Sequence, residues 1–473
     1  MRNSESSCES ERLTPKACTS EIWTSTANPK YRTYTLSNFR SIPQLANFSD
    51  QDLHDMEVVA RVLPFKTNNY VVDNLIDWSN PRDPIFHLNF PQKGMLQPEH
   101  FDQMDRAVRS GDKAKINATA HNIRVQLNPQ PAGQAMNVPR LKDGTELPGI
   151  QHKYKETALF FASQGQTCHA YCTFCFRWPQ FVGMDEVKFA MKESDLLVRY
   201  VAEHPEISDV LFTGGDPMVM RDRVFRVYVE ALLNADLPHL RTIRIGTKSL
   251  SYWPYKFVTD VDADDTLRLF EMVSESGKNL AVMAHFNHPI ELATPAVQAA
   301  IKRINRTGAQ IRTQSPILNQ INADAEVWRS MWAEQVRQEC FPYFMFLTRD
   351  TGAQHYFGVP LARAWEIFSS AMRKVSGLGR TVRALSMSTG PGKIQVAGVA
   401  TIHGEKVFVL RVIQGRNPEW CYKPFFAKYD EKALWLDDLQ PAFGEKQFFF
   451  QAEYQGMMHE AESQVEVQKV VGL

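Results

Sequence analysis

Short apolar runs alternate with amphipathic stretches through the middle of the chain. The runs have the length of buried strands, and the stretches between them have apolar residues at helical spacing. Six candidate strands occur in order, at 157–163, 209–214, 241–246, 280–285, 309–314 and 342–347. Candidate helices lie between them, at 193–204, 222–236, 264–277, 295–307 and 324–338. This alternation predicts repeated βα units and a parallel sheet, open or closed into a barrel.

The regions on either side have a different pattern. Residues 1–30 are rich in Ser, Thr, Glu and Lys with few periodic apolar positions, so we expect a disordered tail. Residues 31–150 combine a helix near Asp50–Val62 with Pro- and Asn-containing connectors, which predicts a mostly helical N-terminal domain. The C-terminal part, 351–473, is expected to form an α/β cap with a helix and two strands, near 360–375, 394–402 and 406–413.

Polar residues directly follow three of the predicted strands. They form the segments Gly214-Gly215-Asp216, Thr247-Lys248 and Asn287-His288. The carboxyl ends of parallel strands meet at one edge of a sheet, and that edge is where such folds build their sites. We therefore expect these three segments to lie together.

Composition limits the partners of the chain. Hydrophobic residues make up 44%, and 53 Lys and Arg balance 53 Asp and Glu, so no field favours nucleic acid or an anionic membrane. No stretch approaches the roughly 18 consecutive apolar residues of a membrane span, and the N-terminus lacks the apolar core of a signal peptide. We expect a cytoplasmic enzyme that acts on a small molecule.

Three of the seven cysteines, Cys168, Cys172 and Cys175, stand within eight positions after the first predicted strand. An odd total and this clustering favour reduced thiols that bind a metal. Three thiolates would leave one iron of a [4Fe-4S] cluster free to bind the amino and carboxylate groups of a small molecule. A structural zinc site is the alternative, but it needs four ligands and no second cysteine pair stands nearby.

The CxxxCxxC spacing, with Phe174 before the last cysteine, resembles the radical S-adenosylmethionine (SAM) superfamily. Further along, Thr213-Gly-Gly-Asp216-Pro217, Arg244-Ile-Gly-Thr247 and His285-Phe-Asn-His288-Pro289 resemble lysine 2,3-aminomutases. This likeness continues in order from about residue 148 to 400. It implies a partial (β/α)6 TIM-like barrel at 151–350 and the cofactors SAM and pyridoxal phosphate (PLP).

The resemblance also assigns roles to individual residues. It places Gly214, Gly215 and Asp216 at the methionyl group of SAM, and glycines at a strand end do permit close approach of a ligand to the backbone. Lys393, which we expect in a flexible Gly/Pro-rich loop, matches the lysine that the family bonds to PLP. Tyr154 matches the ring against the PLP pyridine, and Arg177 the arginine that holds the substrate carboxylate. Taken without the resemblance, these residues would be a turn, a solvated lysine, a core tyrosine and a surface ion pair.

The chain departs from the family pattern at the substrate side chain. Two aspartates hold the ε-ammonium in lysine-acting members, and Ala323 and Ser386 stand at the positions we match to them. Losing the partner of a buried charge costs about 3–5 kcal/mol, so lysine is not expected as substrate unless Asp324 replaces the missing carboxylate. We expect a neutral or smaller amino acid instead.

Two further departures concern PLP and zinc. Thr157 stands where the family has an arginine that contacts the PLP phosphate, so Lys153 or Lys155 would have to serve that group. The C-terminal zinc-binding cysteines of the family are also missing, since Cys421 stands alone.

These observations predict a PLP-dependent aminomutase, an isomerase that moves the amino group of an α-amino acid other than lysine from C2 to C3. The resemblance also implies an electron donor such as flavodoxin or ferredoxin, and a homo-oligomer. Thr157 favours an alternative, a radical SAM enzyme that modifies another small molecule or a protein side chain without PLP. A third hypothesis is an iron–sulfur or zinc protein with no catalytic activity.

Overall fold

The computed structural model describes residues 29–128, 136–184 and 189–460. The predicted tail, 1–30, therefore lies almost wholly outside the described residues. Among the described helices, none combines the length and apolar character needed to cross a membrane.

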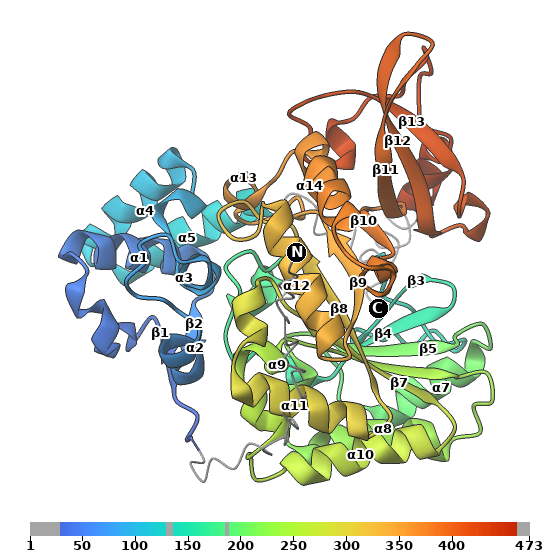
Figure 1. The fold of residues 1–473 in the computed structure, drawn as a ribbon, viewed down its shortest axis with the longest axis horizontal. Coiled ribbons are helices and arrows are strands. Elements are labelled where there is room, and N and C mark those ends of the chain that lie inside the picture. The colour runs from blue at the N-terminus through green and yellow to red at the C-terminus, as the bar shows by residue number, and fades with distance from the viewer. Residues whose placement is uncertain (1–28, 129–135, 185–188, 461–473) are drawn as a thin grey trace, which may run out of the picture.

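One mixed sheet dominates the α/β fold (Figure 1). Its strand order is β13-β12-β11-β10-β9-β8-β7-β6-β5-β4-β3. Strands β4 to β10 run parallel to one another, and β3 and β11 to β13 are antiparallel to their neighbours. The strands are β3 (Ile150–Tyr154), β4 (Thr157–Phe161), β5 (Asp209–Thr213), β6 (Thr242–Thr247), β7 (Asn279–His285), β8 (Gln310–Pro316), β9 (Phe341–Phe346), β10 (Ala384–Ser388), β11 (Gly392–Ile402), β12 (Glu405–Gly415) and β13 (Pro424–Lys428).

The predicted βα series is present, and the parallel run continues one strand further than the six we predicted. The extra strand is β10, which pairs in parallel with β9. It lies in the region assigned to the C-terminal cap, so the parallel sheet crosses the boundary drawn at residue 350. The connecting helices lie along the outside of the sheet (Figure 1): α7 (Ser194–Glu203), α8 (Asp222–Asn234), α10 (Ala263–Glu275), α11 (Pro295–Arg306), α12 (Ala325–Arg337) and α14 (Leu361–Arg373).

Local signals fix several helix starts where the sequence predicts them. The Thr294 hydroxyl accepts from the Val297 amide (3.3 Å) at the start of α11, with Pro295 in the first turn. Ser49 and Asp52 form a capping box at the start of α1. The N-terminal region holds more helices than the one we located, with α1 (Asp50–Val62), α2 (Asn69–Asn74), α3 (Pro84–Asn89), α4 (Pro98–Ser110), α5 (Lys113–Leu127) and a small sheet of β1 (Thr33–Thr35) and β2 (Lys66–Asn68).

The two faces of the large sheet have different environments. In β5, β6, β8 and much of β11, buried residues alternate with partly exposed ones. Parallel strands are usually buried on both faces, so this alternation shows that one face packs against helices while the other stays accessible. The sheet is also curved, as a contact between distant strands shows. Lys153 on β3 donates to the carbonyl oxygen of Thr389, just after β10, although β4 to β9 lie between these two strands in the sheet. The accessible face is therefore the inner face of a curved sheet.

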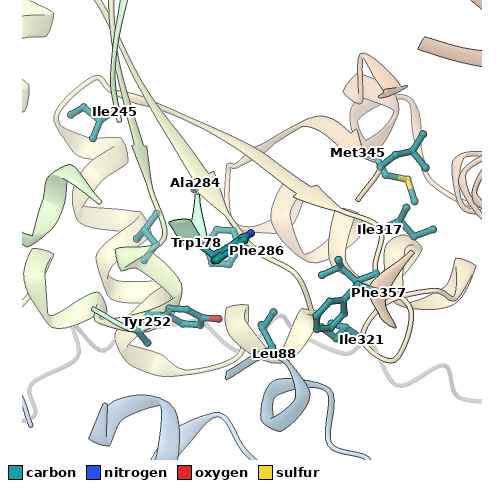
Figure 2. Close-up of a cluster of buried hydrophobic side chains, with 14 of the residues drawn as sticks. Leu88, Trp178, Ile245, Tyr252, Ala284, Phe286, Ile317, Ile321, Met345 and Phe357 are labelled. Atoms are coloured by element: carbon teal, nitrogen blue, oxygen red, sulfur yellow. The ribbon is translucent and has the colours of Figure 1, made fainter. Parts of the chain in front are cut away.

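A single hydrophobic core joins the N-terminal helices to the sheet domain. Figure 2 shows Leu88 of α3 in one buried cluster with Tyr252, which follows β6, and Phe357, which follows β9. Each of these side chains is at most 1% exposed. The N-terminal region is thus packed onto the carboxyl ends of the parallel strands.

Candidate active site

The loop that follows β4 carries the three cysteines, as the sequence predicts. Burial raises the pKa of all three thiols, that of Cys172 to about 12, and that of Cys168 further because the Asp216 carboxylate lies nearby. Iron would therefore have to displace protons from neutral thiols. Among the described residues no three His, Cys, Asp or Glu side chains converge on one metal position. A cubane cluster does not require this, since each thiolate binds a different iron.

Residues of the N-terminal region hold the backbone of the cysteine loop, a role that sequence patterns did not reveal. Lys66 Nζ donates to the carbonyl oxygen of Cys168 (2.6 Å), and Asn68 Nδ2 donates to that of His169 (3.1 Å). The Tyr31 hydroxyl also donates to His169 (2.7 Å). Because these donors come from distant sequence, the loop takes its shape only when both parts of the chain are folded.

The two glycines after β5 admit the cysteine loop rather than open space for a ligand. A Cβ on Gly215 would lie 2.4 Å from the Thr167 oxygen, and one on Gly214 would lie 2.4 Å from Gln166 Nε2. Gly214 also has a φ of 136°, which other residues rarely adopt. The close approach that we expected of these glycines is thus to the segment leading into Cys168.

The Asp216 carboxylate is already engaged within the protein. It accepts hydrogen bonds from the Thr247 hydroxyl (2.7 Å), the Ser249 hydroxyl (3.0 Å) and the backbone amides of Met218 and Lys248 (both 2.9 Å). These bonds occupy most of its acceptor sites. In this structure Asp216 ties the end of β5 to the end of β6, and its contact with SAM stays a prediction.

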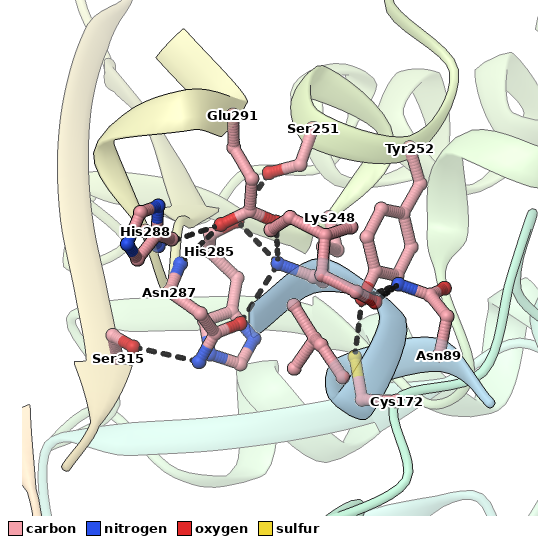
Figure 3. Close-up of polar contacts among 12 residues, drawn as sticks. Asn89, Cys172, Lys248, Ser251, Tyr252, His285, Asn287, His288, Glu291 and Ser315 are labelled. Atoms are coloured by element: carbon pink, nitrogen blue, oxygen red, sulfur yellow. Dashed lines mark hydrogen bonds and ion pairs between the residues drawn. The ribbon is translucent and has the colours of Figure 1, made fainter. Parts of the chain in front are cut away.

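A buried ion pair continues this band of polar contacts toward β7 (Figure 3). Lys248 Nζ contacts Glu291 (2.6 Å) and Asn287 Oδ1 (2.9 Å), and Glu291 is fully buried. Beside it, the Tyr252 hydroxyl shares a hydrogen bond with Cys172 Sγ (3.5 Å). The polar segments after three strands do lie together, as predicted, and they bond mainly to one another beneath the cysteine loop.

Removing the Glu291 carboxylate is expected to destabilise the protein. In Glu291→Ala the buried Lys248 ammonium loses its counterion, which should lower the free energy of unfolding by about 3–5 kcal/mol. Urea denaturation measures the change. Glu366→Ala is the matched control, since it breaks an exposed pair with Arg363 and should cost less than about 1 kcal/mol. Equal losses in the two variants would refute the supporting role of the buried pair.

Lys393 lies on a strand, which corrects the expectation of a flexible loop. It is the second residue of β11, with Ser388 of β10 and Gln414 of β12 as its neighbours in the sheet. Its side chain lies on the inner face, where Nζ donates to Gln414 Oε1 (3.1 Å). Burial, with help from Arg244 and Arg383, lowers the pKa of Lys393 to about 7. The amine is therefore largely neutral in mildly alkaline solution, as a nucleophile requires.

Tyr154 is brought next to Lys393 although 238 intervening residues separate the two in the sequence. Lys393 Nζ lies 5.9 Å from the centroid of the Tyr154 ring. Lys153, on the same strand as Tyr154, is the lysine that faces this site, while Lys155 is exposed. Burial lowers the pKa of Lys153 well below its usual value, and the nearby Arg416, Arg349 and Lys393 lower it further. The site therefore gathers cations around an aromatic ring.

Arg177 is partly buried, two residues after Cys175. Burial lowers the pKa of its guanidinium to about 10, while Cys175 raises it and Arg349 lowers it. The guanidinium stacks on Phe161 (4.4 Å) and Phe176 (5.2 Å). In the part of the chain that the structure describes, Arg177 makes no ion pair, so the surface ion pair considered from the sequence is absent there. Its bidentate contact with a substrate carboxylate stays a prediction.

The positions matched to the family's two aspartates offer no carboxylate. Ala323 packs against the core, and the Oγ of Ser386 is buried without a hydrogen-bond partner among the described residues. The Asp324 carboxylate caps α12 by accepting from the Glu326 amide (2.7 Å), so it does not replace the missing group. The Thr157 hydroxyl accepts a long hydrogen bond from Arg244 (3.4 Å), which also pairs with Asp209 (2.7 Å).

A cavity of about 480 Å³ borders the cysteine loop. Its walls come from the N-terminal segment, the loop itself and the turns after β5 and β6, and include Tyr31, Lys66, Cys168, Arg221 and Trp253. This volume is in the range of small-molecule sites.

Comparison with known proteins agrees with these features, although no family model matches the chain. It is 30% identical over 391 residues to a putative L-lysine 2,3-aminomutase of Aquifex aeolicus, covering 82% of this chain and 91% of the relative. L-lysine 2,3-aminomutase of Bacillus subtilis is 22% identical over 380 residues, with 79% and 70% covered. Glutamate 2,3-aminomutase of Clostridioides difficile is 28% identical over 254 residues, with 53% and 56% covered.

Among solved structures, Streptococcus suis SuiB overlaps 57% of this chain and 56% of its own, with 12% identity and a TM-score of 0.33. A score this low supports no conclusion. The aminomutase relatives, together with the cysteine loop after the first parallel strand of an α/β sheet, define this chain as a radical SAM protein. The chain belongs to the lysine 2,3-aminomutase family.

Proposed function

We propose that the protein is an aminomutase that moves the amino group of an α-amino acid other than lysine from C2 to C3. The observation that carries the proposal is the group around Lys393: a buried amine of lowered pKa, 5.9 Å from an aromatic ring and close to further cations. A PLP-binding site needs these three elements, a nucleophilic amine, a ring to pack on the pyridine, and cations for the phosphate.

The residues present fit PLP and an iron–sulfur cluster. Lys393 would bond to PLP, Tyr154 would pack on its ring, and Lys153 with Arg416 would hold its phosphate in place of the arginine lost at Thr157. Cys168, Cys172 and Cys175 would hold a [4Fe-4S] cluster. When bound, the cluster and SAM supply a radical that removes hydrogen from the substrate, and PLP carries the migrating nitrogen.

The remaining roles belong to side chains of this chain. Arg177 would orient the substrate through its carboxylate, beside the cysteine loop. Ala323 and Ser386 leave no carboxylate for a lysine ε-ammonium, which supports a substrate other than lysine. The relatives named glutamate 2,3-aminomutase and L-lysine 2,3-aminomutase show that such substrates differ within the family. We also propose a reduced flavodoxin or ferredoxin as electron donor, and a homo-oligomer.

The test is an anaerobic screen of the twenty amino acids with reconstituted enzyme, SAM and a reductant. We expect both 5′-deoxyadenosine and a β-amino acid with at least one amino acid other than lysine. Conversion of lysine alone would overturn the substrate proposal. Formation of 5′-deoxyadenosine with no rearranged amino acid would overturn the aminomutase proposal.

The lowered pKa of Lys393 predicts how PLP attachment depends on pH. A lysine with a pKa near 7 gains its neutral, nucleophilic form between pH 6 and 8, so the rate of PLP attachment should rise about tenfold there and then level off. An ordinary lysine would keep gaining rate up to about pH 10. Stopped-flow absorbance of the lysine-bound PLP band measures the rate, and a rise that continues beyond pH 9 would contradict the prediction.

The alternative, a radical SAM enzyme without PLP, is favoured by Thr157, whose hydroxyl leaves the phosphate one arginine fewer than in the family. A purified protein that shows no visible PLP band after PLP addition, yet forms 5′-deoxyadenosine, would support it.

A further inference from the structure

Two partly buried arginines, Arg177 and Arg349, lie beside the same aromatic ring at the edge of the proposed substrate site. The guanidinium carbon of Arg177 is 5.2 Å from the centroid of Phe176, and that of Arg349 is 5.3 Å from it. Arg177 comes from the cysteine loop, whereas Arg349 follows β9. The two cations therefore converge from opposite parts of the sequence.

Within the described residues, the Nε donor of Arg349 is left without a hydrogen bond. The carboxylate nearest to it among the described residues is Asp350, whose oxygen is 3.7 Å from Nε, too far for a hydrogen bond. That Nε is buried and has no hydrogen-bond partner among the described residues. A guanidinium offers five N–H donors, and leaving one buried and unpaired costs free energy. Asp350 can orient this side chain, but it leaves the Nε donor available to a ligand.

Arg349 also lies close to the other cations of the site. It contributes to the lowered pKa of both Lys153 and Arg177, as a neighbouring positive charge does. If Lys153 and Arg416 hold the PLP phosphate and Arg177 holds the substrate α-carboxylate, Arg349 has no ligand anion assigned, and its one ion pair among the described residues is the loose contact with Asp350.

Ser386, whose carbonyl oxygen accepts from the Leu347 amide two residues before Arg349 (2.9 Å), points to the same conclusion. Ser386 pairs with Gln395 and Ser388 pairs with Lys393, so Ser386 lies two residues along β10 on the face that carries Lys393. Its buried hydroxyl has no hydrogen-bond partner in the ranges that the structure describes. A hydroxyl donor and a guanidinium with an unpaired Nε suit an anionic or strongly accepting group, and the guanidinium repels an ammonium.

We propose that the substrate is an acidic α-amino acid, aspartate or glutamate, whose side-chain carboxylate binds Arg349 while its α-carboxylate binds Arg177. This inference rests on the aminomutase function proposed above and replaces the neutral side chain expected from the sequence. A bidentate pair with Arg349 supplies the carboxylate specificity, and the Ser386 hydroxyl completes the contacts.

The test measures binding rather than turnover. Isothermal titration calorimetry on the anaerobic holoenzyme, loaded with cluster, SAM and PLP, compares glutamate with glutamine and aspartate with asparagine. We expect at least one acidic amino acid to bind about tenfold or more tightly than its amide. Arg349→Gln should abolish that preference and leave amide binding unchanged, and Arg349→Lys should restore part of it. Arg363→Gln, at an exposed arginine of α14, should behave as the unchanged protein.

Two results would overturn the inference: amides that bind as tightly as the acids, or an acid preference that survives in Arg349→Gln. Either can be told apart from failure of the aminomutase function. If neutral amino acids are rearranged, the aminomutase function stands and the acidic specificity fails. If acidic amino acids bind through Arg349 but no β-amino acid forms, the specificity stands and the aminomutase function fails.

Discussion

Replacing Cys172 by alanine is expected to remove the iron–sulfur cluster and with it all cleavage of SAM. Only two thiolates, Cys168 and Cys175, would remain on the loop, and two ligands do not hold a cubane cluster that already lacks a fourth. The change also removes the sulfur that bonds to the Tyr252 hydroxyl. Iron and sulfide analysis after anaerobic reconstitution, followed by assay of 5′-deoxyadenosine, measures both losses.

Cys340→Ala is the control for this experiment. Cys340 is also buried and its thiol also has a raised pKa, but it lies just before β9 and outside the cysteine loop. The control variant should keep the iron content and SAM cleavage of the unchanged protein. Equal iron loss in both variants, or a full cluster in Cys172→Ala, would show that the loop cysteines are not the ligands.

The strands of the βα series could be located from sequence because each is an apolar run between two amphipathic helices. The strand β10 was missed because ALSMS is short and carries two serines, both of which lie on the inner face. The strand β3, IQHKY, was missed for a similar reason, since three of its five residues are only partly buried and polar or aromatic. Both strands border the proposed PLP site, where the inner face must be polar.

The roles of the glycines and of Asp216 show what local sequence cannot supply. A pair of glycines at a strand end indicates close approach, but the partner is set by the tertiary fold, and here it is Thr167. An aspartate after them indicates an acceptor, but its donors come from the loop after β6. The hydrogen bond from Lys66 to the Cys168 carbonyl oxygen joins residues 102 positions apart, so no local sequence pattern indicates it.

Two of the candidate residues that the sequence resemblance grouped are brought together by the fold. Lys393 and Tyr154 meet because the sheet curls and brings β3 toward β11. Arg349 was not foreseen, since a single arginine after a strand has no distinguishing pattern. Its importance depends on the unpaired Nε and on the second arginine beside the same ring.

Replacing Lys393 by alanine is expected to abolish covalent attachment of PLP. The other lysine at this site is Lys153, which donates to the Thr389 carbonyl oxygen and is surrounded by cations. It is therefore poorly placed to replace Lys393 as the attachment point. The visible band of lysine-bound PLP should be absent in Lys393→Ala. Borohydride reduction and peptide mapping should label residue 393 in the unchanged protein and no lysine in the variant.

The exposed Lys155→Ala provides the matched control, because it removes a lysine two residues from Lys153 without touching the inner face. It should keep the band, the label at residue 393 and the conversion of amino acid. The Lys393→Ala variant should still cleave SAM slowly, because the cysteine loop is held by Lys66 and Asn68 rather than by β11. Loss of rearrangement with SAM cleavage retained would separate the two halves of the chemistry, whereas a PLP band that persists in Lys393→Ala would exclude Lys393 as the attachment point.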